Sequence, residues 1–176
     1  MPPYIKPLAL LIVLSGVACS APPSTTAAAS DAAAAPAAAA ATPATPVHDG
    51  RPIEITADDT MKFSVAEIAA KPGEKLSVTL INVGTTPKFS MGHNWLLVAP
   101  MGDLQPFLVA AAEAVTTDYV PVATQKDRVL AATKLLGPKE RDTVTFTAPT
   151  TPGRYDFVCS FPGHYQVGMR GVLIVG

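Results

Sequence analysis

Cysteine, histidine and tryptophan are scarce in this chain, and their scarcity limits the chemistry that it can carry. The 176 residues include 2 cysteines, 3 histidines and 1 tryptophan. An excess of charge of one sign is also lacking, because 13 lysine and arginine residues against 14 aspartate and glutamate residues leave a formal net charge of −1. Neither a basic surface nor a block of like charges is therefore expected, which argues against nucleic acid as a partner.

The chain also lacks an apolar run that is long enough to span a bilayer. Lys6 precedes an apolar run over residues 8–18, which is shorter than the roughly 20 residues that a membrane-spanning helix needs. A basic start, a short apolar run and small residues at its end are typical of an export signal. We therefore expect residues 1–18 to be a signal peptide, and the protein to be exported to the periplasm or the extracytoplasmic face of a bacterial membrane.

Cys19 follows this run directly. The segment Gly16-Val17-Ala18-Cys19 is similar to a bacterial lipobox, in which the cysteine is lipidated and becomes the first mature residue, although lipoboxes usually have leucine at the position of Gly16. The alternatives are ordinary cleavage after Ala18, which leaves a free thiol, and a disulfide between Cys19 and Cys159. We favour a lipid anchor at Cys19, because an unpaired thiol is unusual in an oxidising compartment.

Residues 19–49 form an alanine- and proline-rich linker with almost no charge and no periodic apolar face. Such a segment cannot bury enough apolar surface to offset the entropy lost on ordering. We expect a disordered N-terminal tether, and a flexible chain of this length spans about 30 Å on average.

Residues 50–176 have the pattern of a folded all-β domain. Apolar and polar residues alternate in the runs 76–80 and 143–147, which is typical of half-buried strands. One stretch, residues 103–117, has a helical period instead, with Leu104, Phe107, Leu108, Ala111 and Val115 on one face. The pattern predicts an antiparallel Greek-key β-sandwich with one helical insertion. The predicted strands cover residues 53–56, 61–65, 76–82, 95–99, 128–134, 143–148, 154–160 and 172–175.

Three residues with side chains that can bind soft or borderline metal ions lie close together in the sequence near the C-terminus: Cys159, His164 and Met169. Each alone would be interpreted as a buried structural residue, but their clustering on one short glycine-containing loop favours a metal site. Sulfur ligands together with imidazole select copper, and zinc is disfavoured because methionine is not among its usual ligands. A second imidazole must come from His93, the other histidine of residues 50–176.

The segments Met91-Gly92-His93-Asn94-Trp95 and Cys159-Ser160-Phe161-Pro162-Gly163-His164 resemble the metal-binding motifs of azurins, within the cupredoxins, and especially those of the auracyanin type. The resemblance extends over nearly all of residues 50–176. It implies a cupredoxin domain with one copper ion, cycling between Cu(I) and Cu(II), bound by His93, Cys159 and His164 and weakly by Met169 along the axis.

Other roles follow from the same resemblance. The carbonyl of Gly92 would face the metal opposite Met169, and the peptide N–H groups of Asn94 and Phe161 would donate to the sulfur, while the Asn94 side chain would hold the ligand loop. Two features depart from azurin: Met169 lies five residues after His164, as in plastocyanins and auracyanins, where azurins have four. The cysteines of the azurin disulfide are also missing.

In this family electrons pass through the edge of the loop histidine across an apolar patch where partners dock. The matching residues are Met61, Met91, Phe161, Pro162, Gly163 and Val167, although ordinary loop apolarity would also account for them. We expect a monomer that exchanges electrons with redox proteins or membrane electron-transfer complexes at the membrane surface.

The two alternatives to electron transfer are a copper enzyme and a copper carrier. A copper enzyme would need a second, histidine-rich metal site, and the one remaining histidine is His48, in or near the tether; we therefore expect no enzymatic activity. A periplasmic copper carrier or scavenger would favour exposed, exchangeable methionine or histidine clusters. Reversible one-electron cycling without loss of metal would distinguish these two functions.

Overall fold

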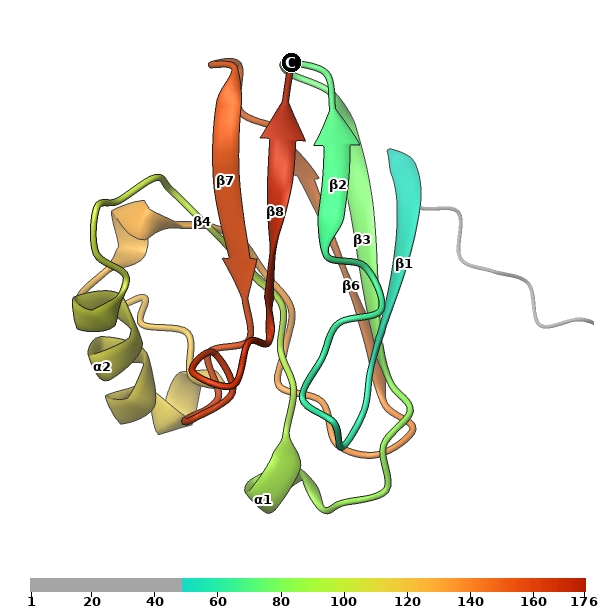
Figure 1. Cartoon of the computed structure of the whole chain (residues 1–176), viewed down its shortest axis with the longest axis vertical. Helices are drawn as coiled ribbons and strands as arrows, with labels where there is room; N and C mark the ends of the chain where they lie inside the picture. The colour runs from blue at the N-terminus through green and yellow to red at the C-terminus, as the bar shows by residue number, and fades with distance from the viewer. Residues whose placement is uncertain (1–48) are drawn as a thin grey trace, which may run out of the picture. The chain divides into compact units, whose positions relative to one another are not determined.

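The computed structural model describes residues 49–176 (Figure 1). The predicted signal peptide, Cys19 and the linker up to residue 48 lie outside the described residues. No helix within residues 49–176 has the length and apolar character needed to cross a membrane.

Two β-sheets make up the folded part, as predicted for a cupredoxin-like sandwich. The first sheet has three strands in the order β1 (Arg51–Ala57), β3 (Lys75–Asn82) and β6 (Arg141–Thr147). The second has five strands in the order β2 (Glu67–Ala70), β8 (Arg170–Val175), β7 (Gly153–Val158), β4 (Leu96–Val98) and β5 (Val129–Ala132).

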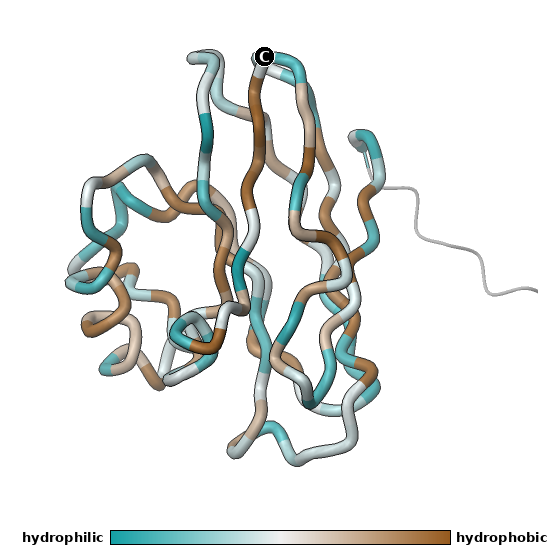
Figure 2. The backbone as a smooth tube through the Cα atoms, in the orientation of Figure 1, coloured by the Kyte–Doolittle hydropathy of each residue, from teal (hydrophilic) through white to brown (hydrophobic). Residues whose placement is uncertain are grey.

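The main core draws apolar side chains from both sheets, because each sheet turns one face of its strands inward. Leu76, Val78 and Leu80 alternate along β3 and are fully buried. They belong to the same cluster as Trp95 and Phe157, whose ring centroids lie 5.5 Å apart. Figure 2 shows apolar residues recurring along β8, whose Leu173 joins this cluster.

Pairing between the strands differs in part from the antiparallel expectation. The pairs β1–β3 and β2–β8 are parallel, whereas β3–β6, β4–β5, β4–β7 and β7–β8 are antiparallel. The predicted strand over residues 61–65 is wrong. Met61 has a left-handed φ of 55° and its N–H closes a turn on the Asp58 carbonyl, so a single bridge between Ala57 and Phe63 forms there instead.

The predicted helical insertion is present and shorter than expected. Helix α2 (Gln105–Glu113) follows Leu104, and its buried residues Phe107, Leu108 and Ala111 lie on the predicted face. Leu104, Phe107 and Leu108 pack in a second cluster with Leu96 and Val98 of β4 and Val158 of β7. Val115 lies beyond α2 in a 3₁₀ turn, η1 (Val115–Thr117), and is 60% exposed. A single-turn helix, α1 (Lys88–Met91), and the 3₁₀ turn η2 (Lys126–Arg128) were not expected.

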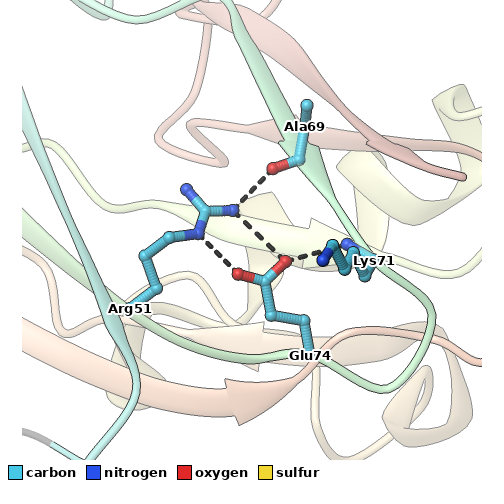
Figure 3. A network of polar contacts seen from close by, with 4 residues as sticks. All are labelled: Arg51, Ala69, Lys71 and Glu74. Atoms are coloured by element: carbon cyan, nitrogen blue, oxygen red, sulfur yellow. Dashed lines mark hydrogen bonds and ion pairs between the residues drawn. The ribbon is translucent and has the colours of Figure 1, made fainter.

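Polar contacts fix the start of β1 against the turn between β2 and β3 (Figure 3). The Arg51 guanidinium donates to the Glu74 carboxylate at 2.5 Å and to the Ala69 carbonyl at 2.6 Å. The same carboxylate accepts the Lys71 N–H at 2.8 Å. Since Ala70 pairs with Val175 at the end of β8, these contacts lie at the opposite end of the sheets from the loop that precedes β8.

Candidate metal centre

Three segments that are distant in sequence converge at one end of the sandwich. His93 precedes β4, Cys159 follows β7, and His164 and Met169 lie in the loop between β7 and β8. Because Leu96 pairs with Val158, the start of β4 and the end of β7 lie side by side. The backbone of His93 is held further by a pair of hydrogen bonds with Leu136, of 3.1 and 2.7 Å.

The three predicted equatorial ligands lie together in the structure. One donor atom from each of His93, Cys159 and His164 falls within 4.8 Å of the others. Cys159 Sγ lies 3.4 Å from His164 Nδ1, and the two imidazole centroids are 5.0 Å apart. His93, Cys159 and Met169 are fully buried and His164 is 3% exposed. Met169 packs in the same apolar cluster as Cys159.

Burial affects the imidazoles and the thiol of this pocket differently: it favours the neutral imidazoles that can bind a metal ion, whereas the thiol must lose its proton when a metal binds. Burial raises the pKa of the Cys159 thiol to about 12, against the opposite effect of hydrogen bonds from the peptide groups of Asn94 and Phe161. Burial lowers the pKa of His93, and burial together with the neighbouring His93 lowers that of His164 to about 4. Both imidazoles are therefore neutral near pH 7, with lone pairs available for binding.

Unsatisfied polar atoms give a direct test of whether copper fits. Both ring nitrogens of His93 are buried and have no hydrogen-bond partner among residues 49–176. A buried polar atom without a partner is costly, so such an atom in a folded protein calls for an explanation. A cation bound between His93, Cys159 and His164 would satisfy one of the two nitrogens, and this set of two imidazoles and a thiol is the set that suits copper.

The loop between β7 and β8 closes on itself through backbone hydrogen bonds. The Met169 N–H donates to the His164 carbonyl at 3.0 Å, and the Cys159 N–H donates to the Met169 carbonyl at 3.1 Å. Gly163 and Gly168 have left-handed φ values of 87° and 91°, which side chains rarely adopt. The residues of the loop thus return the chain to the start of β8 with Met169 directed into the core.

The Asn94 side chain links this loop to the turn at residues 118–119. Its Oδ1 accepts the Ser160 N–H at 2.9 Å, while its Nδ2 donates to Ser160 Oγ at 2.9 Å and to the Asp118 carbonyl at 2.8 Å. Ser160 Oγ also donates to the Tyr119 carbonyl at 2.7 Å. No role for Ser160 or for the two carbonyls follows from the sequence alone. The carbonyls are available as acceptors where Asp118 and Tyr119 adopt left-handed φ values of 57° and 60°.

Gly92 is buried directly before His93, where the surrounding atoms leave no room for a side chain. A Cβ atom at this position would lie 2.7 Å from the Lys88 carbonyl oxygen and 2.8 Å from Leu135 Cγ. Its own φ of −70° is ordinary, so close packing is the reason for glycine here.

The predicted patch residues lie at this same end, in loops except for Met91, which is the last residue of α1. Met61, Met91 and Phe161 are partly buried, Pro162 and Gly163 are exposed, and Val167 is 49% exposed. The Phe161 ring lies 4.7 Å from the His164 ring and 5.1 Å from the Tyr119 ring. Sequence reasoning missed Phe89 of α1, which is 84% exposed. Its position two residues before Met91 was the available signal.

A two-sheet sandwich that buries two imidazoles and a thiol at one end has the architecture of the cupredoxins. The family model of copper-binding proteins of the plastocyanin/azurin family matches residues 52–176, and the chain belongs to this family. Copper is therefore its cofactor, and His93, Cys159 and His164 form the group that can hold one ion. Family and donor set together indicate a blue-copper electron carrier.

Named relatives agree with this assignment. The chain is 36% identical to an azurin of Pseudomonas chlororaphis over 128 residues, which cover 70% of this chain and 96% of the relative. It is 38% identical to the outer membrane protein H.8 of Neisseria gonorrhoeae, over 62% of this chain and 60% of that protein. Among solved structures, the reduced auracyanin of Roseiflexus castenholzii matches with a TM-score of 0.60 and 32% identity, over 73% of this chain and 99% of that one.

Proposed function

We propose that this chain is a one-electron carrier at a membrane surface, with a single copper ion held by His93, Cys159 and His164. The observation that carries the proposal is the buried group of three donor atoms within 4.8 Å of one another, the one group of this kind found among residues 49–176. Its deep burial opposes the alternative of a copper carrier, which must release its metal readily.

Met169 and Gly92 complete the proposed set of ligands. A thioether is a weak axial ligand in sites of this class. Met169 is buried beside Cys159, and its backbone is fixed at both ends of the loop by hydrogen bonds to His164 and Cys159. The Gly92 carbonyl would be a further weak contact to the ion, because Gly92 directly precedes His93 and is closely packed.

The protein surroundings would keep the site nearly unchanged during electron transfer. Bound copper would supply reversible one-electron chemistry between its two oxidation states. Asn94 and Ser160 hold the first residues of the ligand loop through hydrogen bonds to the 118–119 turn, and the peptide groups of Asn94 and Phe161 support the sulfur. The apolar core excludes water, which lowers the reorganisation that each transfer requires.

Electrons are proposed to enter and leave through the edge of His164, across the patch formed by Met61, Met91, Phe161, Pro162, Gly163 and Val167, with Phe89 added. None of these side chains carries a charge, so partners with an apolar contact surface are favoured. The partners are proposed to be redox proteins or membrane electron-transfer complexes.

Attachment to a membrane through a lipid on Cys19 is a further part of the proposal. It is supported by the lipobox-like sequence and by a relative that is named an outer membrane protein. The intact mass of the protein purified from a bacterial membrane tests it: the mass should match a chain that begins at a lipidated Cys19, and an unmodified chain that begins at that residue would contradict it.

Addition of copper(II) to the purified full chain tests the proposed centre. A strong visible absorption from thiolate-to-copper charge transfer is expected, because only a bound thiolate produces it. Cys159→Ser should abolish the colour, and the matched variant Cys19→Ser should retain it. Reversible voltammetric cycling without release of copper would support an electron carrier over a copper carrier, and a colourless wild-type sample would contradict the proposed centre.

A further inference from the structure

Lys62 contacts the ligand loop from a distant part of the chain. It lies in the connection between β1 and β2, and its ammonium group donates a hydrogen bond to the Val167 carbonyl, 105 residues away in sequence. No peptide N–H group among residues 49–176 donates to this carbonyl. The lysine side chain therefore satisfies a loop acceptor that the loop leaves free.

This contact falls on the part of the loop that sets the spacing of the proposed ligands. Val167 and Gly168 lie between His164 and Met169, where this chain has five residues from histidine to methionine. A Cβ atom on Gly168 would lie 2.7 Å from Lys62 Nζ, so the ammonium group also lies against the Gly168 backbone. The other hydrogen bonds of this segment are local: Gly168 donates to Tyr165 at 2.9 Å and Met169 to His164 at 3.0 Å.

The backbone on both sides of Lys62 is well fixed. Met61 is held by its hydrogen bond to Asp58 and has the left-handed φ of 55°. On the other side Phe63 is buried, and its ring lies 5.7 Å from that of Phe157 in β7. The backbone of Lys62 is thus held in a fixed position beside the loop, although the lysine side chain is exposed to solvent.

We propose that Lys62 is a positioning residue for the metal centre. Its charge-assisted hydrogen bond holds the Val167–Gly168 segment, and with it the approach of Met169 to the core. Its positive charge beside the ligand loop also favours the less positive, reduced form of the centre, and so raises the midpoint potential. The second effect rests on the proposed electron-carrier function, whereas the first concerns the loop alone.

Three substitutions separate these effects. Lys62→Arg keeps both charge and donor, Lys62→Gln keeps a donor without charge, and Lys62→Met removes both while keeping an apolar stem. Lys71→Met is the matched control, because Lys71 is an exposed lysine in the turn between β2 and β3 at the opposite end of the sheets (Figure 3).

Amide hydrogen exchange in the copper-free protein tests the loop. In Lys62→Met the Gly168 and Met169 amides should exchange about two- to tenfold faster than in the wild type, the change expected for loss of one hydrogen bond of ordinary strength. Lys62→Arg and Lys71→Met should match the wild type. Exchange at Leu173 in β8 should stay unchanged, which excludes a general loss of stability. Wild-type exchange rates in Lys62→Met at Gly168 and Met169 would overturn the positioning role.

Voltammetry of the copper-loaded protein tests the effect of the Lys62 charge on the midpoint potential. Lys62→Gln and Lys62→Met should lower the midpoint potential, and the difference from the wild type should shrink as salt increases. The potential should be unchanged in Lys62→Arg and Lys71→Met. An unchanged potential in both Lys62→Gln and Lys62→Met would overturn the electrostatic effect. A wild-type protein that stays colourless with copper would instead contradict the proposed function, while the exchange result would still decide the role of Lys62 in the loop.

Discussion

Gly92 shows how strongly a single residue can be constrained beside the candidate centre. It connects α1 to His93, and the Lys88 carbonyl and the Leu135 side chain lie close on the side where its Cβ would be. The backbone contact cannot move away without shifting α1. Any side chain at this position therefore displaces His93 as well.

We expect Gly92→Ala to lower the free energy of unfolding by about 1–3 kcal/mol, the usual cost of overpacking a closely packed site. It should also shift the visible spectrum of the copper-loaded protein, because His93 moves. Chemical denaturation and absorption spectroscopy measure the two effects. Gly102→Ala is the control, since a Cβ atom on Gly102 meets nothing within 4 Å and should change neither quantity. Equal stability and spectra in the two variants would show that Gly92 is not constrained as described.

At the residue scale, the sequence best predicted the roles of residues that lie close to one another in the chain. Cys159, His164 and Met169 could be grouped because they lie within one loop, and His93 followed because residues 50–176 offer no other histidine. The roles of Ser160 and Tyr119 could not be predicted. Their hydrogen bonds depend on the direction of the backbone carbonyls in a turn of two residues with left-handed φ values. Lys62 was missed for a similar reason: nothing in the sequence relates it to a carbonyl 105 residues away.

Asp59 joins two of the connections between elements. Its carboxylate accepts the Thr85 N–H at 3.0 Å, the Thr85 hydroxyl at 2.9 Å and the Thr86 N–H at 3.3 Å, and thereby ties the β1–β2 connection to the one between β3 and α1. The hydrogen bonds from Thr85 hold the pKa of Asp59 below its ordinary value of 3.8. The first connection contains Met61, and the second leads into α1, which ends at Met91 directly before Gly92 and His93.

This arrangement predicts a loss of stability in acid. A carboxyl group with a depressed pKa in the folded state binds protons more readily when unfolded, so its contribution is present above the unfolded pKa and is lost as pH falls through the folded pKa. Asp59→Asn should therefore be less stable than the wild type at neutral pH, and the difference should narrow below about pH 3.8. Urea unfolding as a function of pH measures this, and parallel curves for the two proteins would contradict it.

At the element scale, the sequence predicted seven of the strands and the helical insertion. The prediction failed where residue type and alternation do not decide the backbone conformation or the strand pairing. The strand expected over residues 61–65 has the right residue types, but the left-handed Met61 and its turn prevent a ladder. Strand β2 was missed because it includes two alanines, which are weak strand formers. Parallel pairing of β1 with β3 depends on distant segments and has no local signal.

The molecule as a whole should gain stability from bound copper, because the proposed ligands come from separate segments: His93 precedes β4, Cys159 follows β7 and Met169 precedes β8. A ligand that binds the folded state alone stabilises it by about 4 kcal/mol at a thousandfold excess over its Kd. Copper should therefore raise the Tm of the wild-type chain, and a chelator should reverse the gain. The shift should be largely lost in Cys159→Ser, as measured by calorimetry. An equal rise in Tm in both proteins would show that copper binds at another site.

The hydrogen bonds of Arg51 with Glu74 and Ala69 have a practical consequence. They fix the point where the chain enters its first strand at the end of the sheets that is remote from Cys159 and His164. A protein fastened to an electrode by a short linker just ahead of residue 51 would therefore turn its metal-binding end toward the solution. Fastening through an exposed residue of α1 would turn the same end toward the conductor, and the faster current should come from that orientation.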